Sequence, residues 1–282
     1  MTNPKEMGKH LYRKKVCGED GYDLNFGASV VGVIGGQGSV KTSACLDIAE
    51  KKMMFHPKEK IFWHDTVGSP CQYRKSKYFP YKIFVEEGLD LKFLNATKNT
   101  YITPDITYFK DVDELYRVAP YKTINAVYFA HKKSWVGFNG KSSKQGLLEY
   151  LMSNQQQEWQ TIILDEMETL FPKNVNNQTE ERWYEWINDV VAEKIKECRK
   201  SRVGVVGNYH KHSSIFYDVS NKFMFHLWGL GSLPRDTRVK QNCVDQLKPG
   251  EFWIDYQGTY FGKIGIKTIY NPPEDEWIAS YW

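Results

Sequence analysis

The feature that most constrains the fold is a short apolar run that leads into a glycine-rich loop and then a helical pattern. The run SVVGVI (29–34) is rich in β-branched residues and is typical of a buried parallel strand. GGQGSVKT (35–42) follows it, and residues 42–54 then carry apolar side chains at helical spacing. A strand, a glycine-rich loop and a helix in this order predict an α/β fold with a mainly parallel sheet.

The loop itself predicts a nucleotide site. Successive backbone N–H groups and a helix N-terminus can surround a phosphate, with Lys41 reaching the β- and γ-phosphates of ATP and Thr42 holding Mg²⁺. A tight strand-to-helix turn without a ligand is the alternative. The predicted binding residues are Gly35, Gly36, Gln37, Gly38, Ser39, Val40, Lys41, Thr42 and Asp165, with Thr42 and Asp165 as the Mg²⁺ ligands.

Val40 departs from the pattern, which has glycine before the lysine. A β-branched residue adds bulk there, and a positive φ would add strain of roughly 1 to 3 kcal/mol. That strain could weaken nucleotide binding by one or two powers of ten, but Lys41, Thr42 and the downstream acids remain. We therefore expect a working ATPase, with a ring that binds nucleotide without hydrolysis as the alternative.

Two later strands end in polar residues that suit this chemistry. LDE (164–166) closes an apolar strand, so Asp165 can hold Mg²⁺ and Glu166 can deprotonate a water for attack on the γ-phosphate. Without the loop, two acids at this position could equally cap a helix. Asn208 ends the strand RVGVVGN and can sense the γ-phosphate or position the water, or it can be a plain turn residue. His210 and His212 follow, without a third ligand for zinc.

The remaining pattern predicts one core domain with additions. We expect an N-terminal arm (1–26), an ATPase domain (27–270) with an inserted or variable region (66–140), and a C-terminal tail (271–282). Strands are also predicted at 60–65, 92–96, 126–130 and 221–228, helices at about 142–157 and 180–198, and a hairpin turning at Gln257-Gly258. No segment has the length and apolarity of a membrane span or a signal peptide, so a cytoplasmic location is expected.

The charge pattern indicates a polyanionic partner. The net charge of +4 decides little, but two segments, 71–82 and 131–144, interleave basic and aromatic side chains, as a DNA-contacting surface requires. Each could instead be a solvated loop whose rings pack inward. Five scattered cysteines without a CxxC pair indicate buried thiols. The candidate DNA contacts are Arg74, Lys75, Lys77, Lys132, Lys133, Trp135, Lys141 and Lys144.

Residues 195–239 and LKPGEFWI (247–254) resemble the C-terminal half of the FtsK/HerA-type P-loop translocase ATPases. The shared pattern is a "GV" strand with a polar end, an "SSI…DVS-N" segment, a further strand, "RD-R" and "L-PGEF" before a hairpin. With the loop and LDE, the resemblance covers roughly residues 27 to 265 in order, although 66–140 matches nothing.

The resemblance implies a RecA-like core that assembles into a ring, usually a hexamer, and moves double-stranded DNA by ATP hydrolysis. A neighbouring subunit would supply an arginine to each site. The candidates are Arg235 and Arg238, followed by Arg199 and Arg202. The small size favours a virus- or plasmid-encoded packaging or transfer ATPase, with a virion or transfer-apparatus protein as a further partner. A Zot-like phage-assembly or secretion ATPase acting on protein is the alternative.

Overall fold

The computed structural model describes most of the region from residue 30 to residue 281. The described residues are 30–65, 75–101, 104–128, 158–169, 171, 173, 192–198, 200–215, 217–234, 237, 239–256, 259–265 and 277–281. Among them, no helix combines the length and the apolar character that crossing a membrane requires.

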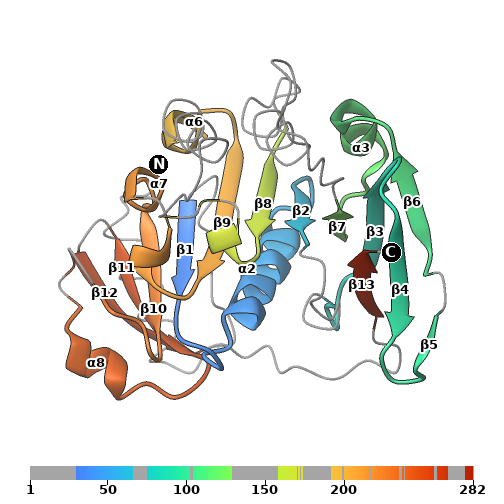
Figure 1. Cartoon of the computed structure of the whole chain (residues 1–282). Coiled ribbons are helices and arrows are strands. Elements are labelled where there is room, and N and C mark those ends of the chain that lie inside the picture. The colour runs from blue at the N-terminus through green and yellow to red at the C-terminus, as the bar shows by residue number, and fades with distance from the viewer. Residues whose placement is uncertain are drawn as a thin grey trace.

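A ten-stranded sheet forms the centre of the molecule (Figure 1). Its order is β12-β11-β10-β1-β9-β8-β2-β7-β3-β6, and the eight strands from β10 to β6 run parallel. The hairpin β11-β12 adds an antiparallel edge. The bounds are β1 Val30–Ile34, β2 Lys60–His64, β3 Tyr81–Glu86, β6 Ile106–Phe109, β7 Ile124–Tyr128, β8 Gln160–Leu164, β9 Val203–Tyr209, β10 Phe225–Gly229, β11 Glu251–Tyr256 and β12 Thr259–Gly265.

Helices cover both faces of this sheet, because the central strands alternate apolar side chains toward each. On one face, α2 (Lys41–Phe55) packs Ile48 and Met53 against the inner strands. Among the described residues, the other face contacts four short helices: α3 (Val112–Val118), α6 (Ala192–Glu197), α7 (Tyr217–Ser220) and α8 (Gln241–Asp245). Asp111 begins α3 as an N-cap, since its side chain accepts a hydrogen bond from the Glu114 N–H at 2.8 Å.

A second, three-stranded sheet lies beside the parallel one, at its β3 end (Figure 1). It consists of β4 (Leu91–Asn95), β5 (Thr100–Tyr101) and β13 (Trp277–Tyr281), all antiparallel. Phe93 and Ala279 pack with Ile83 and Val85 in a separate small core. The segment expected to be a tail therefore contains a strand that is paired with the region expected to be an insertion.

The predicted fold class is confirmed: the chain is α/β, with a mainly parallel central sheet, flanking helices and a C-terminal hairpin. The helix after the loop and the strands predicted at 29–34, 60–65, 92–96, 126–130, 161–166, 202–208 and 221–228 are all present, with shifted ends. β3, β6, α3 and β13 were not predicted from the sequence. The helix expected at 142–157 lies outside the described residues, and only α6 is described from the one expected at 180–198.

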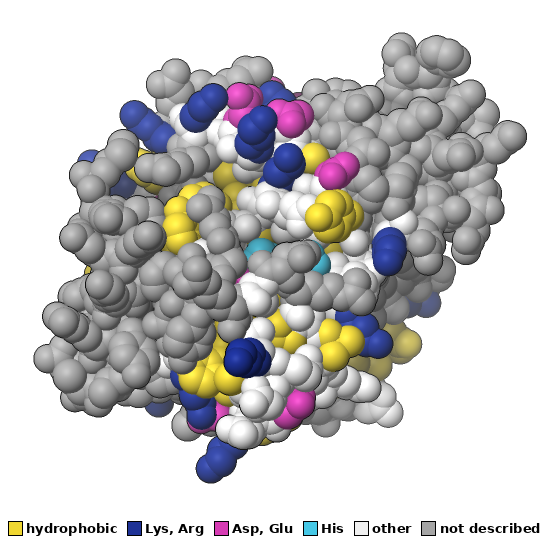
Figure 2. Space-filling view, turned by 90° about the vertical axis from the view of Figure 1, so that its left-hand side faces the viewer, with side chains coloured by type: hydrophobic (Ala, Val, Ile, Leu, Met, Phe, Trp, Pro, Cys, Tyr) yellow, Lys and Arg dark blue, Asp and Glu magenta, His cyan; other side chains and the backbone are white. Residues whose placement is uncertain are grey.

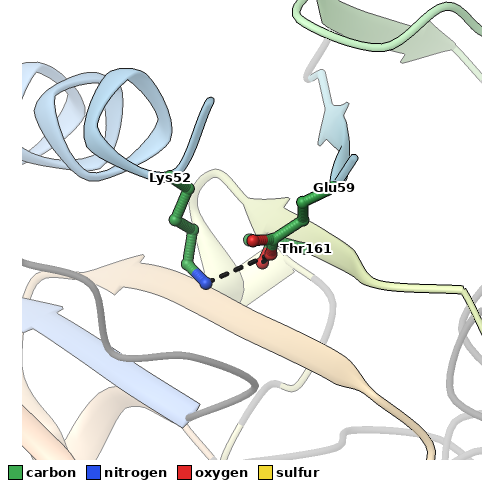
Figure 3. A network of polar contacts seen from close by, with 3 residues as sticks. All are labelled: Lys52, Glu59 and Thr161. Carbon is green, nitrogen blue, oxygen red and sulfur yellow. Dashed lines mark hydrogen bonds and ion pairs between the residues drawn. The ribbon is translucent and has the colours of Figure 1, made fainter. Parts of the chain in front are cut away.

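A buried ion pair joins α2, the helix that follows the glycine loop, to the residue that precedes β2 (Figure 3). Lys52 Nζ lies 3.2 Å from Glu59 Oε1, and the two side chains are 0% and 1% exposed. The same carboxylate oxygen accepts a hydrogen bond from the Thr161 hydroxyl at the beginning of β8. The pair therefore fixes the far end of α2 while its first residue lies in the glycine loop.

Removing one charge of this pair should destabilise the protein strongly, because the other charge stays buried. We expect Lys52→Met to lower the free energy of unfolding by roughly 3 to 5 kcal/mol, and Lys52→Met with Glu59→Met to recover most of the loss. Urea denaturation measures both. Lys200→Met, which removes an exposed pair with Glu197, should cost under about 1 kcal/mol. A loss of similar size in Lys52→Met and Lys200→Met would contradict a structural role for the buried pair.

Candidate nucleotide site

The glycine loop connects the C-terminal end of β1 to α2 and is anchored by the strands on both sides of β1. Gly35 N–H donates to the carbonyl of Tyr209, the last residue of β9, at 3.3 Å. Gly36 N–H donates to the carbonyl of Leu230, just after β10, at 2.8 Å. Ser39 folds back so that a Cβ at Gly35 would lie 2.3 Å from its Oγ. The loop is therefore held as a preformed turn, and glycine is required at its first position.

Lys41 points into this loop rather than into solvent. Its Nζ donates to the carbonyls of Gly35 at 2.8 Å and Gly36 at 3.1 Å, and lies 3.2 Å from His210 Nδ1. Burial lowers the pKa of the ammonium, and the nearby carboxylate of Glu168 opposes that shift most strongly. The positive group thus lies within the glycine loop, where a phosphate site would need it.

Val40 has the positive backbone angle at which strain was expected. Its φ and ψ are 68° and 32°, in the left-handed region. The side chain is 37% exposed, so its bulk projects partly into solvent. A β-branched residue in this conformation costs roughly 1 to 3 kcal/mol. The folded protein therefore carries this strain in the loop itself.

The predicted acids and Asn208 come together because β9 lies between β1 and β8. Asn208 is in register with Val33 of β1, and Gly207 with Leu164 of β8, which places the Asn208 amide beside the acids that follow β8. Its Nδ2 donates to Asp165 Oδ1, and its Oδ1 accepts from the Glu166 N–H at 2.9 Å. Asp165 and Asn208 are buried, whereas Glu166 is exposed. One amide therefore positions both acids.

The backbone of Glu166 is strained in the same way as that of Val40. Its φ is 50°, a left-handed value that glutamate seldom adopts. Such angles persist where the surroundings impose them, and here the hydrogen bond from the Glu166 N–H to Asn208 does so. The consequence is that Glu166 turns outward while Asp165 stays buried beneath it.

Cys45 lies beneath the acids, on the first turns of α2. The thiol is fully buried, and burial followed by the charge of Asp165 raises its pKa. The thiol therefore stays neutral. Cys198 is also buried, as expected, whereas Cys243 is only half-buried, and Cys17 and Cys71 lie outside the described residues.

The two histidines of the H-x-H stretch have different surroundings. His210 is exposed and contacts Lys41. His212 is buried, with its ring 5.5 Å from that of His226 and 5.9 Å from that of Trp228. Burial, with a contribution from His212, lowers the pKa of His226 to about 3, so that ring is neutral. Within the described ranges, no three His, Cys, Asp or Glu side chains form a metal-binding group.

Two features near the loop had no signal in the sequence. Glu168 lies in the short η2 helix (Met167–Thr169) after β8 and accepts hydrogen bonds from His210 N–H and, at 3.0 Å, from Ser214 Oγ. Gly231, with φ 75°, passes so close to the loop that a Cβ there would lie 3.2 Å from the Gly36 Cα. Neither belongs to a motif, because each is brought to the site by the sheet: Glu168 follows β8, which pairs with β9, and Gly231 follows β10, which pairs with β1.

Most of the predicted DNA contacts and arginines lie outside the described residues. These are Arg74, Lys132, Lys133, Trp135, Lys141, Lys144, Arg199, Arg235 and Arg238.

Three of the predicted DNA contacts and arginines are described, Lys75, Lys77 and Arg202, and they lie away from the glycine loop. Lys75 is half-buried and Lys77 is exposed, in a segment that Ser76 joins to Glu50 of α2 at 2.6 Å. Arg202 precedes β9, at the edge of the sheet opposite the loop. On the face of the molecule nearest β12, several basic side chains gather near the top of the view with acidic ones beside them, and others lie singly below (Figure 2).

Comparison with known proteins finds no matching family model and no matching curated protein. Among solved structures, the chain is similar to the genome packaging NTPase B204 from Sulfolobus turreted icosahedral virus 2 bound to sulfate. The identity is 13%, the match covers 81% of this chain and 90% of that one, and the TM-score is 0.48.

Two further structures are similar to the chain, the second at a lower TM-score. B204 bound to AMPPCP matches with 13% identity, 81% and 92% coverage, and a TM-score of 0.47. The N-terminal domain of zonular occludens toxin from Neisseria meningitidis matches with 11% identity, 87% coverage of each chain, and a TM-score of 0.34. Because these identities and TM-scores are low, we assign the fold class from the strand order of this chain itself.

Replacing Val40 by glycine should stabilise the nucleotide-free protein. Relief of the left-handed strain, less the extra entropy of an unfolded glycine, predicts a gain of about 1 kcal/mol in unfolding free energy. The opposite substitution at a nearby position, Gly38→Val, places a β-branched residue at φ 77° and should lower the unfolding free energy by a similar amount. Urea denaturation without nucleotide compares the two variants. A destabilised Val40→Gly protein would show that the valine side chain makes stabilising contacts in the loop.

Gly231→Ala should weaken ADP binding, because its methyl group would press on the backbone of Gly36. We expect the dissociation constant for ADP to rise by about tenfold, because displacing the Gly36 backbone would cost about one to two kcal/mol of binding free energy. Gly88→Ala is the matched control, with φ 84° and open space around its Cβ. Both variants should lose stability, and only Gly231→Ala should lose affinity in calorimetric titration. Equal ADP affinity in the two variants would contradict a bracing role for Gly231.

Proposed function

We propose that this chain is an ATP-hydrolysing motor of the FtsK/HerA type that translocates or packages double-stranded DNA as a homo-oligomeric ring. The observation that carries the proposal is the meeting of three separate motifs at one edge of the sheet. Lys41 lies in the glycine loop, and Asn208 hydrogen-bonds both acids that follow β8. A plain strand-to-helix turn would not need a buried acid and amide beside it.

ATP would bind with its β- and γ-phosphates at the loop, where Lys41 supplies positive charge. The hydroxyl of Thr42 and the carboxylate of Asp165 form an oxygen-only donor set, which suits Mg²⁺, and we assign both as its ligands. When bound, Mg²⁺ would neutralise charge on the phosphates. Thr42 is the second residue of α2, and Asp165 is buried and oriented by Asn208, so both are fixed by neighbouring elements.

Glu166 is our candidate for the general base. It is exposed, whereas Asp165 next to it is buried, so the two acids have separate environments for separate roles. The water that attacks the γ-phosphate would give its proton to the Glu166 carboxylate. Asn208 fixes the Glu166 backbone and would keep that carboxylate in place.

The ring and the DNA partner rest on the sequence. An arginine from the segment 234–238, Arg235 or Arg238, would reach the site of a neighbouring subunit and stabilise charge on the transferred phosphoryl group. This segment begins just after Gly231, which packs against the loop. The basic aromatic segments 71–82 and 131–144 would contact DNA phosphates and bases. A virion or transfer-apparatus protein would be a further partner.

The decisive experiment is ATP hydrolysis with and without double-stranded DNA. We expect DNA to stimulate the wild-type rate, and Glu166→Gln to lower it by a factor of about 10² to 10⁴, the usual contribution of a general base. Glu166→Gln should still bind ADP, because the loop is intact. Glu193→Gln, on the exposed side of α6, is the matched control and should hydrolyse ATP normally.

The alternatives give other results. Hydrolysis that is indifferent to DNA would favour an ATPase that assembles or secretes protein, and the absence of turnover in both the wild type and Val40→Gly would favour a nucleotide-binding ring. Mass measurement with nucleotide bound tests the ring directly. A protein that stays monomeric at all concentrations would overturn the role proposed for Arg235 and Arg238.

A further inference from the structure

The ammonium of Lys41 has a full set of hydrogen-bond partners in the nucleotide-free protein. A lysine ammonium has three N–H donors. Nζ has three contacts, with the Gly35 carbonyl at 2.8 Å, the Gly36 carbonyl at 3.1 Å and His210 Nδ1 at 3.2 Å. A phosphate oxygen can therefore gain a hydrogen bond from Lys41 only if one of these partners is displaced.

His210 is the partner that comes from outside the loop. It follows β9 directly and brings its ring across the loop from the neighbouring strand. Because the ammonium can only donate, Nδ1 must be the acceptor, which requires a neutral ring with its proton on Nε2. The contact thus specifies one tautomer of His210.

Glu168 holds His210 in place through the backbone. Its Oε1 accepts from the His210 N–H and from Ser214 Oγ, the latter at 3.0 Å. Lys173 N–H donates to the Ser214 carbonyl at 3.3 Å, so the segment after β8 and the segment after β9 are joined at two points. The Glu168 carboxylate also lies close enough to attract Lys41. The contacts from Lys41 to His210 and from His210 to Glu168 therefore link the glycine loop to the segments that follow β8 and β9.

We propose that His210 is a positioning residue that holds Lys41 until a phosphate replaces it, and that Glu168 holds His210 ready for this exchange. The inference rests on the proposed function, since it concerns the phosphate site of that function. On nucleotide binding, Lys41 turns to the β- and γ-phosphates and the ring of His210 is released. Nucleotide entry is thereby communicated to the segment after β9, which contacts the segment carrying both acids.

The first test is ADP affinity, measured by calorimetry with Mg²⁺ on the full chain. His210→Ala removes a competing acceptor, so ADP should bind about threefold to tenfold more tightly, the range for losing one hydrogen bond to the free state. His210→Asn keeps an acceptor near the position of Nδ1 and should bind ADP like the wild type. AMP has no β-phosphate for Lys41, and its affinity should be equal in all three proteins.

The outcomes separate this inference from the proposed function. Unchanged or weaker ADP binding by His210→Ala, with normal binding by the wild type, overturns the inference alone. Tighter binding of AMP and ADP by the same factor also overturns it, because the effect would then not pass through Lys41. A wild-type protein that binds no ADP overturns the proposed function and this inference with it.

The second test follows Glu168 and the imidazole of His210 directly. Nitrogen NMR of the histidine side chains should show His210 as the Nε2–H tautomer without nucleotide, and a changed Nδ1 shift with ADP. Glu168→Gln keeps an oxygen acceptor and should preserve the nucleotide-free signal, whereas Glu168→Ala should lose it. Glu193→Ala is the control. A His210 signal that is identical with and without ADP, or unaffected by Glu168→Ala, would overturn the proposal.

Discussion

The parallel pairing of β9 with both β1 and β8 is the constraint on which the candidate site depends. In a parallel sheet the carboxyl ends of adjacent strands meet at one edge, so the loop after β1, the Asn208 amide near the end of β9 and the acids after β8 converge there. Asn208 can hydrogen-bond both acids because its strand pairs directly with β8, and the pairing of the same strand with β1 brings the glycine loop to this edge. A shift of one residue in either register would turn its side chain to the opposite face.

Two residues at this edge have backbone angles that their side chains disfavour, Val40 and Glu166. Each is adjacent to a residue whose side chain must be held in one place at the candidate site. Val40 precedes Lys41, and Glu166 follows the buried Asp165. The surrounding hydrogen bonds of the loop and of Asn208 maintain both conformations. The protein thus places a lysine and a carboxylate at the cost of local strain, which the cores on both faces of the sheet offset.

The sequence predicted the parts of the fold whose signal is local. The apolar run at β1, the glycines at 35–38 and the acids ending β8 each identify their element without reference to the rest of the chain. Glu168 and Gly231 could not be predicted in this way, because each reaches the loop only through strands that are distant in sequence. The pairing of β13 with β4 is similarly non-local, so residues 277–281 alone gave no indication that they form a strand.

The anchoring of the glycine loop also has a consequence for biosynthesis. Gly35 and Gly36 are held by the carbonyls of Tyr209 and Leu230, which emerge from the ribosome long after the loop itself. Such long-range parallel pairing forms late in folding, because loop closure must precede it. A nascent chain that contains only the loop and its helix would therefore have the motif without the geometry. The geometry of the loop would arise only once residues 209 and 230 have been synthesised and their strands have paired.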